Sequence, residues 1–171
     1  MTHPIARFLR LPLTVRLAAL AWVALLVGVA VRVAVSHPWS QSVVPVYLHA
    51  GGQWRAGADP YAPNYFHDAY RNPPHVAAAF APLTRLPEKA AGLLWRGVGA
   101  AVFLLGLRAY TRHVLPPLTP SQTGLVFLAA MPVALLSVNN GQANVLLAGA
   151  VLFGAADAAR RAGRSPARCS R

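Results

Sequence analysis

An all-α fold that crosses a membrane several times is predicted by the composition, the placement of charges and four apolar runs. Of the 171 residues, 56% are hydrophobic and 12% are charged, whereas soluble domains average about 25% charged residues. Most of the charges lie between or beside long apolar runs, which is the pattern of a multi-span membrane protein. The sequence therefore predicts a bundle of about four transmembrane helices, with interfacial helices in the first outer loop.

The formal charge of +12 is placed as in a membrane protein. Basic residues precede the first apolar run and follow the last one, as the positive-inside rule expects for cytoplasmic segments. No folded soluble domain is left to present a basic face to nucleic acid, so a nucleic-acid partner is not expected. We predict a multi-pass protein of the plasma (inner) membrane, with both termini in the cytoplasm and membrane lipids as partners.

The four apolar runs cover residues 17–35, 90–107, 123–138 and 143–156. The last two are shorter than the about 20 residues that a bilayer requires, so flanking residues or neighbouring helices are expected to complete them. The first is longer than the apolar part of a usual signal peptide, and a retained span is favoured over a cleaved one. Arg32, near its outer end, is expected to reach the headgroups.

Residues 36–89 form the predicted first outer loop. Residues 45–50 indicate a short amphipathic helix closed by Gly51 and Gly52. Residues 76–86 are apolar but too short to span, so they are expected to lie along the interface or to re-enter it. A tight outer turn is expected over residues 139–142.

The outer loop carries Asp59 and Asp68, two of the four acidic residues of the chain. A chain with few carboxylates has few candidates for general acid–base chemistry. Asp59 precedes a proline, which restricts its backbone. Two interpretations stay open for it, a turn-forming aspartate or a general base at the membrane surface. The same two apply to Asp68, where the turn is favoured.

Other polar residues suit the binding of a phosphate or a sugar. Arg96 lies inside an apolar run, where an ionisable residue is a functional candidate by default. Its guanidinium suits a lipid-linked phosphate, or it reaches the interface as a snorkelling side chain. Arg71, in the loop, is a candidate for similar reasons, because its guanidinium also suits a phosphate. The carboxamides of Gln142 and Asn144 can bond sugar hydroxyls or satisfy a helix–helix turn, and Tyr61 fits an interfacial belt or sugar stacking.

No cofactor and no metal site are predicted. The six histidines lack metal-site spacing, and the single cysteine, Cys169, excludes an internal disulfide and a cysteine-based metal site. Because the chain contains no Gly-rich phosphate loop, HExxH or GxSxG motif, nucleotide binding of the soluble type is not expected.

Several short motifs follow one another along the chain. They are Trp54 with Gly-Ala-Asp-Pro-Tyr at 57–61, Tyr-Arg-Asn-Pro-Pro at 70–74, Ala-Pro-Leu at 81–83, Leu86-Pro87, Leu94-Trp95, and Gly-Gln-Ala-Asn-Val-Leu-Leu at 141–147 after Pro132. No single piece is specific, but in their order and placement together they resemble the N-terminal part of glycosyltransferase family 87, a group of membrane enzymes in the GT-C superfamily. The similarity covers about residues 18–162.

The resemblance implies transfer of a hexose, often mannose, from a polyprenyl-phosphate sugar donor to a lipid or glycan acceptor on the outer face. Asp59 occupies the position of the acidic residue that deprotonates the acceptor in the family. We expect Arg71 or Arg96 to neutralise the departing phosphate. Gln142 and Asn144 are expected to contact the sugar or to stabilise the outer turn. Tyr61 and Asn72 join the predicted substrate-binding residues.

Residues 1–162 are therefore expected to form the N-terminal transmembrane part of such an enzyme, followed by a disordered basic tail over residues 163–171. Family members are typically more than twice this length, which predicts that the chain is a truncated or frameshifted piece. Two alternatives are a non-catalytic membrane module, such as a lipid-binding or assembly subunit, and a transporter fragment. A transporter predicts polar residues at mid-span, whereas those seen here gather at the outer ends.

Overall fold

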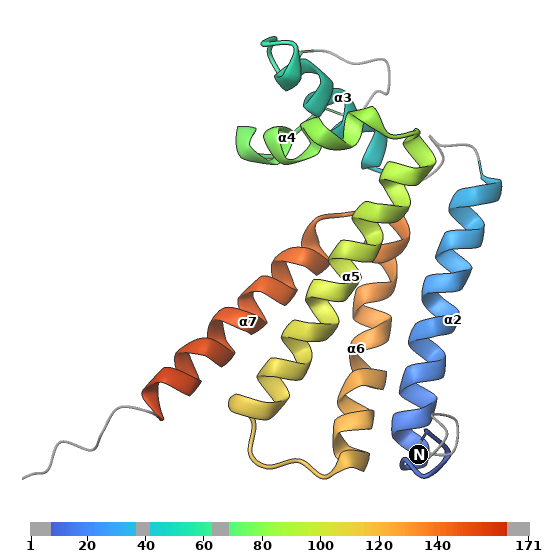
Figure 1. Cartoon of the computed structure of the whole chain (residues 1–171), viewed down its shortest axis with the longest axis vertical. Coiled ribbons are helices and arrows are strands. Elements are labelled where there is room, and N and C mark those ends of the chain that lie inside the picture. Colours follow the sequence, from blue (N-terminus) through green and yellow to red (C-terminus); the bar gives the residue numbers. More distant parts are fainter. Residues whose placement is uncertain (1–7, 37–41, 63–68, 164–171) are drawn as a thin grey trace, which may run out of the picture. The chain divides into compact units, whose positions relative to one another are not determined.

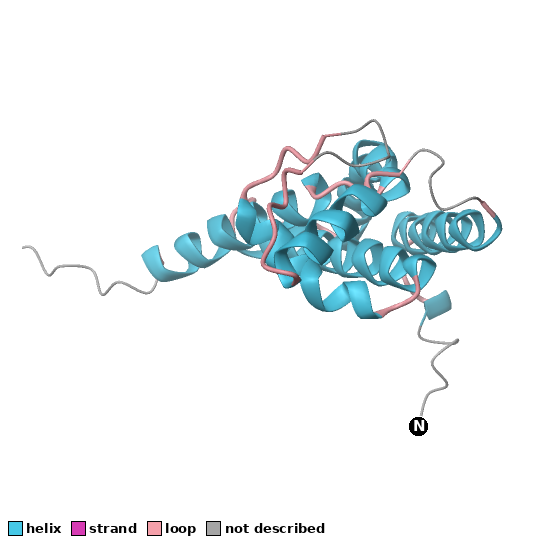
Figure 2. Ribbon diagram, turned by 90° about the horizontal axis from the view of Figure 1, so that it is seen from above, coloured by secondary structure: helices cyan, strands magenta, loops and turns pink. Residues whose placement is uncertain are grey.

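The computed structural model describes residues 8–36, 42–62 and 69–163. Over these ranges the chain forms helices joined by loops, and no strand occurs in them (Figures 1 and 2). The predicted all-α fold is confirmed. Asp68 and the tail from residue 164 onward lie outside the described residues.

Three helices are long and apolar enough to cross a membrane, namely α2 (Leu13–Val35), α5 (Glu88–His113) and α6 (Pro120–Asn140). They contain three of the four predicted spans. The 21 residues of α6, the shortest of the three, extend for about 31 Å at about 1.5 Å per residue, which matches a hydrocarbon core of about 30 Å. The membrane-bundle prediction is therefore confirmed for these helices.

The fourth predicted span is also helical, as α7 (Asn144–Ala162), but it is not among the three candidates. Its last six residues include Asp157, Arg160 and Arg161. The apolar part before Asp157 has only 13 residues and extends for about 20 Å, which is shorter than a bilayer core. Polar flanking residues would therefore have to complete this span.

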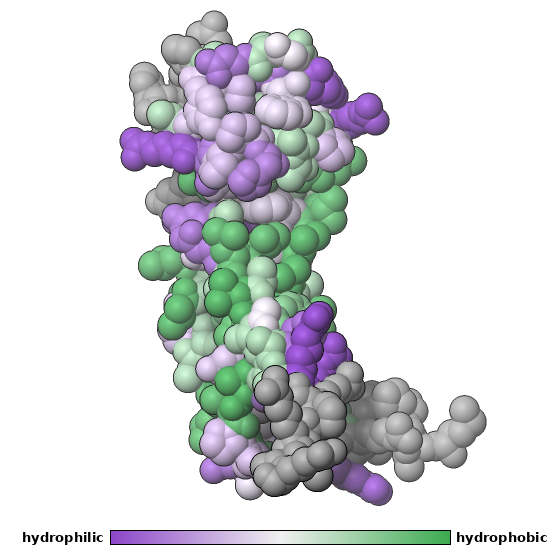
Figure 3. Space-filling model, turned by 90° about the vertical axis from the view of Figure 1, so that its left-hand side faces the viewer, coloured by the Kyte–Doolittle hydropathy of each residue, from purple (hydrophilic) through white to green (hydrophobic). Residues whose placement is uncertain are grey.

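Three short helices occupy the first outer loop: α3 (Val44–Arg55), α4 (Pro74–Phe80) and the 3₁₀ helix η1 (Ala81–Arg85). Proline stands in the first turn of each one, where its missing N–H costs no hydrogen bond. Because Pro82 cannot donate to the preceding turn, α4 gives way to the tighter helix η1. On the face shown in Figure 3, hydrophilic residues gather over this part of the chain.

The predicted helix end at Gly51 and Gly52 is wrong, because α3 continues through both glycines to Arg55. The reason is the close packing of α3 against α4 and η1 (Figure 1). A Cβ atom on Gly51 would lie 2.8 Å from the carbonyl carbon of Phe80. Glycine is thus placed inside α3 to let two helix backbones approach each other.

Two compact units make up the chain, and each is described by itself. We call the first the span unit; it contains Met1–Ala24, Gly99–Leu135 and Ala143–Arg171. The second, the loop unit, contains Leu25–Val98 and Leu136–Gln142. The loop unit thus includes the whole predicted outer loop and the last turn of α6.

The span unit packs through small residues. In α7, a Cβ atom on Gly149 would lie 2.6 Å from the backbone nitrogen of Phe103 in α5. In α6, a Cβ on Gly124 would lie 2.7 Å from the backbone of Thr14 in α2. Such close backbone approaches at small residues are a usual way for membrane helices to associate.

The loop unit has its own hydrophobic core between α3 and α4. Its buried members are Val46, Tyr47, Ala50, Tyr70, Ala77 and Phe80. Phe80 is completely buried, and burial of such a side chain stabilises a fold by roughly 1.5–3 kcal/mol. This core holds the segment that carries the candidate catalytic residue.

Candidate active site

The turn that carries Asp59 is fixed by the end of α3. Gly57 has φ +71°, a left-handed conformation that glycine adopts without steric cost. The Gly57 amide donates to the Trp54 carbonyl at 3.1 Å, and the Ala58 amide donates to the Gln53 carbonyl at 2.9 Å. These two bonds form a Schellman motif, so the chain leaves the helix in a defined direction.

Asp59 itself begins a β-turn. The Ala62 amide donates to the Asp59 carbonyl at 3.1 Å, with Pro60 at the second position, where proline is favoured. The Tyr61 amide donates to Asp59 Oδ1 at 2.9 Å. The turn-forming interpretation is thus seen directly for Oδ1, whereas Oδ2 has no hydrogen-bond partner within the described residues and the side chain is exposed.

Tyr61 connects this turn to the segment before α4. Its hydroxyl donates to the Asn72 carbonyl at 3.0 Å, and its ring lies 5.4 Å from that of Tyr70, centroid to centroid. Burial raises the pKa of the Tyr70 phenol above its usual value, and the hydroxyl donates to the Pro73 carbonyl at 3.0 Å. The structure therefore brings together the predicted residues Asp59, Tyr61 and Asn72.

Arg71 lies between Tyr70 and Asn72 in this same segment, and its side chain is exposed. The ion pairs formed by the described residues both involve Asp157 and leave Arg71 out. Arg71 is therefore a surface residue that stands in the chain between two residues that contact Tyr61.

The predicted outer turn at residues 139–142 ends α6 with a second Schellman motif. Gly141 has φ +69°; its amide donates to the Val138 carbonyl at 3.3 Å, and the Gln142 amide donates to the Ser137 carbonyl at 2.9 Å. As at Gly57, glycine is required because the left-handed backbone disfavours residues with a Cβ.

Arg96 ties this turn to the rest of the loop unit. Its Nε donates to the Val138 carbonyl at 3.1 Å, and its Nη2 donates to the Asn139 carbonyl at 3.2 Å and to Ser42 Oγ at 2.9 Å. Its Nη1 donates to the Gly92 carbonyl at 3.1 Å. The residue is only 7% exposed, so the guanidinium neutralises the carbonyl end of α6, where a cation is stabilising.

Two further side chains hold the same turn. Trp95 donates from its indole nitrogen to the Gly141 carbonyl at 2.8 Å. Arg32, which was expected to reach the headgroups, donates from its Nη1 to the Asn139 carbonyl at 3.0 Å and to Asn139 Oδ1 at 2.9 Å. Two arginines and a tryptophan thus bond carbonyls in the last turn of α6 and in the residue after it.

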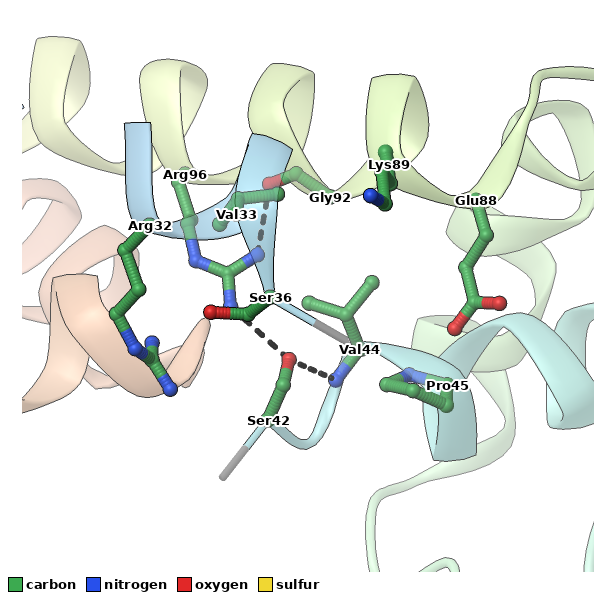
Figure 4. Close-up of a pocket in the computed structure, with 10 residues that line it drawn as sticks. All are labelled: Arg32, Val33, Ser36, Ser42, Val44, Pro45, Glu88, Lys89, Gly92 and Arg96. Carbon is green, nitrogen blue, oxygen red and sulfur yellow. Dashed lines mark hydrogen bonds between the residues drawn. The ribbon is translucent and has the colours of Figure 1, made fainter. Parts of the chain in front are cut away.

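Figure 4 shows a small pocket that both arginines line. Three cations, Arg32, Lys89 and Arg96, line it together with the carboxylate of Glu88. The Lys89 ammonium donates to the Ala34 carbonyl at 2.6 Å. The cavity measures about 30 Å³, enough for about two water molecules and too small for a hexose. Its cations therefore act on helix ends in this structure.

A chain of aromatic rings joins the turn at residues 139–142 to the Asp59 turn. The Tyr47 ring lies 6.3 Å from Trp95 and 6.4 Å from Tyr70, in edge-to-face arrangements, and Tyr70 in turn contacts Tyr61. Phe80 packs against Tyr47 at 5.0 Å and against Trp95 at 4.6 Å. Ring pairs at these distances stabilise a fold by more than the burial of their surface alone. The turn at residues 139–142 and the Asp59 turn are therefore connected by continuous aromatic packing.

The last two predicted residues fall in different units. Gln142 closes the α6 turn, and its Oε1 accepts from the Ser137 hydroxyl at 3.3 Å, which matches the turn-stabilising interpretation. Asn144 is the exposed first residue of α7 and belongs to the span unit. The structure therefore groups Gln142 with Arg96, and Asn144 is described separately.

One known protein family matches this chain. The model of glycosyltransferase family 87 matches residues 70–167, more than half of the chain. The chain belongs to glycosyltransferase family 87. Neither curated proteins nor solved structures give a match. The family 87 match contains Arg71, Asn72, Arg96, Gln142 and Asn144, and it begins after the Asp59 turn. The assignment of Asp59 therefore rests on the loop itself.

Sequence reasoning missed several residues that hold the site of this family 87 chain. Trp95 entered only as part of the Leu94-Trp95 motif, yet its indole bonds the Gly141 carbonyl. Tyr47 was not among the predicted site residues. Ser42 had no signal at all in the sequence. The position of Arg32 in the last turn of a predicted helix was a usable signal, because cations at helix ends often satisfy carbonyls.

Proposed function

We propose that this family 87 chain acts in a membrane glycosyltransferase of the GT-C superfamily. It transfers a hexose, with mannose as the proposed sugar, from a polyprenyl-phosphate donor to a hydroxyl of a lipid or glycan acceptor. The reaction takes place at the outer face of the plasma (inner) membrane, with both termini cytoplasmic. Family membership supports the reaction class, and the three apolar helices support the membrane setting.

The observation that carries the proposal is the different hydrogen bonding of the two oxygens of the Asp59 carboxylate. Oδ1 accepts from the Tyr61 amide, which fixes the orientation of the group. Oδ2 has no hydrogen-bond partner within the described residues, and we assign it to take the proton from the acceptor. A general base must reach its substrate in a fixed orientation, and this exposed, oriented carboxylate supports such a role.

In the proposed reaction, the acceptor oxygen forms a bond to the anomeric carbon of the donor sugar. The bond between that carbon and the phosphate oxygen breaks, and polyprenyl phosphate leaves with the electron pair. The acceptor proton passes to Asp59 Oδ2. The proposed reaction uses no cofactor; its leaving group is the lipid phosphate.

The leaving phosphate needs a cation, and Arg71 suits this role better than Arg96. The donors of Arg96 are directed at carbonyls of Val138, Asn139 and Gly92, so phosphate binding would require those bonds to break. Arg71 is exposed beside the residues that hold the Asp59 turn, and a guanidinium binds phosphate through two parallel hydrogen bonds. We assign Arg96 to positioning the turn and Arg71 to the phosphate.

The remaining residues bind the sugar or hold the site. Tyr61 is half-exposed, at 48%, and offers an aromatic face for a sugar ring. Asn72, Gln142 and Asn144 supply carboxamides for sugar hydroxyls. We propose these roles from the chemistry of the four side chains and from the positions of the residues, three in the loop unit and one at the start of α7.

The test is the rate of sugar transfer by Asp59→Asn in membranes that contain the whole chain and a radiolabelled polyprenyl-phosphate mannose donor. Asparagine keeps an oxygen for the Tyr61 amide and loses the basic carboxylate. We expect transfer to fall about 100- to 10,000-fold, the usual contribution of a general base.

The matched control is Asp157→Asn, which removes the same charge from a carboxylate that pairs with Arg160 and Arg161 in the span unit. Transfer by this variant should stay near the wild-type rate. Full activity of Asp59→Asn contradicts the proposed base. Absence of transfer by the wild-type chain would instead favour the alternative of a non-catalytic membrane module.

A further inference from the structure

The span unit contains a basic groove that the proposed reaction does not use. It lies between the end of α5, the connection to α6 and the first turns of α6, at the point where Figure 1 shows α5 joined to α6. Its volume is about 400 Å³, within the range of small-molecule sites. Arg108, Arg112 and Thr123 line it together with the apolar side chains of Leu118 and Phe127.

The charge of the groove is unbalanced. Arg108 and Arg112 are four residues apart on one helix, so their side chains lie on the same face and repel each other. Both are exposed, and both ion pairs recorded for the described residues belong to Asp157, not to these arginines. An anion bound between the two guanidinium groups would relieve this repulsion.

The depth of the groove points to the membrane interface. Glu88 begins α5, and Arg108 follows it by 20 residues, about 30 Å along the helix. This distance equals the thickness of the hydrocarbon core. When Glu88 stands at one interface, Arg108 therefore stands at the other, at the level of the lipid headgroups.

The groove is also preformed. The connection turns over residues 114–116, and α6 starts with a capping box in which the Thr119 amide donates to Gln122 Oε1 at 2.9 Å. The Gln122 amide in return donates to Thr119 Oγ1 at 3.2 Å, which fixes the start of the helix. A site with fixed walls loses little conformational entropy when it binds a ligand.

We propose that this groove binds the headgroup of an anionic phospholipid. The phosphate lies between Arg108 and Arg112, and the acyl chains leave along Leu118 and Phe127. The Thr123 hydroxyl donates to the Thr119 carbonyl at 3.1 Å, so its oxygen accepts a hydrogen bond from a headgroup hydroxyl. Basic pockets between membrane helices are typical sites for anionic headgroups. The apolar wall beside the cations favours a lipid over a free phosphate ion.

The experiment measures the thermal unfolding of the whole chain in a neutral detergent during titration with short-chain phosphatidylglycerol. A ligand that binds the folded state raises Tm in a saturable way. We expect this rise with phosphatidylglycerol and not with phosphatidylcholine of the same chain length. In the variant Arg108→Gln with Arg112→Gln, the apparent Kd should rise at least tenfold.

The matched control changes Arg55 and Arg85 to glutamine, which removes the same charge from exposed sites in the loop unit. It should bind the lipid as the wild type does. Unfolding without lipid shows that each variant is folded. An equal response to phosphatidylcholine, an unchanged Kd in the Arg108 and Arg112 variant, or the same Tm rise with inorganic phosphate at equal concentration overturns the proposal.

Discussion

The packing of the turn at residues 139–142 predicts that two glycines with the same backbone conformation tolerate alanine very differently. Gly57 and Gly141 have φ values of +71° and +69°. Alanine in this conformation costs about 1–2 kcal/mol at either site. At Gly57 no atom lies within 4 Å of the added Cβ, whereas at Gly141 it would lie 2.5 Å from Val44 Cγ2 and 3.2 Å from Arg96 Cζ.

Overpacking of this kind adds about 1–3 kcal/mol to the strain. Gly141→Ala should therefore lower the free energy of unfolding by about 2–5 kcal/mol, and Gly57→Ala by only about 1–2 kcal/mol. The gain from restricting the unfolded chain is the same for both variants and cancels in the comparison. For a chain of this size, 1 kcal/mol corresponds to about 2–4 °C in Tm.

The assay is thermal unfolding in detergent, followed by far-ultraviolet circular dichroism, with the two single variants beside the wild type. Gly141→Ala should unfold about 2–12 °C below Gly57→Ala, because only Gly141→Ala carries the additional free-energy cost of overpacking. Equal Tm values for the two variants, or a lower value for Gly57→Ala, would refute the proposed packing of the turn against α3 and α5.

Three further predictions concern single contacts. Gly149→Leu should destabilise the span unit by several kcal/mol, whereas Gly154→Leu, with open space around it, should change Tm little in the same assay. Trp95→Phe removes the indole bond to the Gly141 carbonyl and should cost about 1–3 kcal/mol in chemical unfolding. Hydrogen bonds from Arg160 and Arg161 lower the pKa of Asp157 below its usual value of 3.8. The contribution of this carboxylate to the stability of α7 is therefore present above pH 3.8 and is lost as the pH falls below it. Asp157→Asn should abolish this acid-dependent loss of α7 helicity.

The helical spans were predictable because their signal is local. Length and apolar composition alone locate α2, α5 and α6, since a bilayer sets one simple requirement. The extension of α3 past Gly51 was not predictable, because it depends on the distance between two backbones that only the folded core defines. Local propensity marks a glycine pair as a helix end, and tertiary packing overrides that preference.

The candidate site was predictable in part for the same reason. The turn at Asp59 follows from Pro60 directly after it, and the Schellman motifs follow from Gly57 and Gly141. The role of Arg96 in holding carbonyls could not be read from its place in an apolar run, because its partners are distant in sequence. Exposure of Arg71 likewise appears only in the folded loop unit.

The most direct test of the central claim compares sugar transfer by Asp59→Asn and Asp59→Ala at equal amounts of folded chain. Asparagine keeps the hydrogen bond from the Tyr61 amide, and alanine removes it together with the carboxylate. If Asp59 is the general base, both variants lose transfer to a similar extent. Wild-type transfer by Asp59→Asn with loss only in Asp59→Ala would show that the residue forms the turn and does not take the proton.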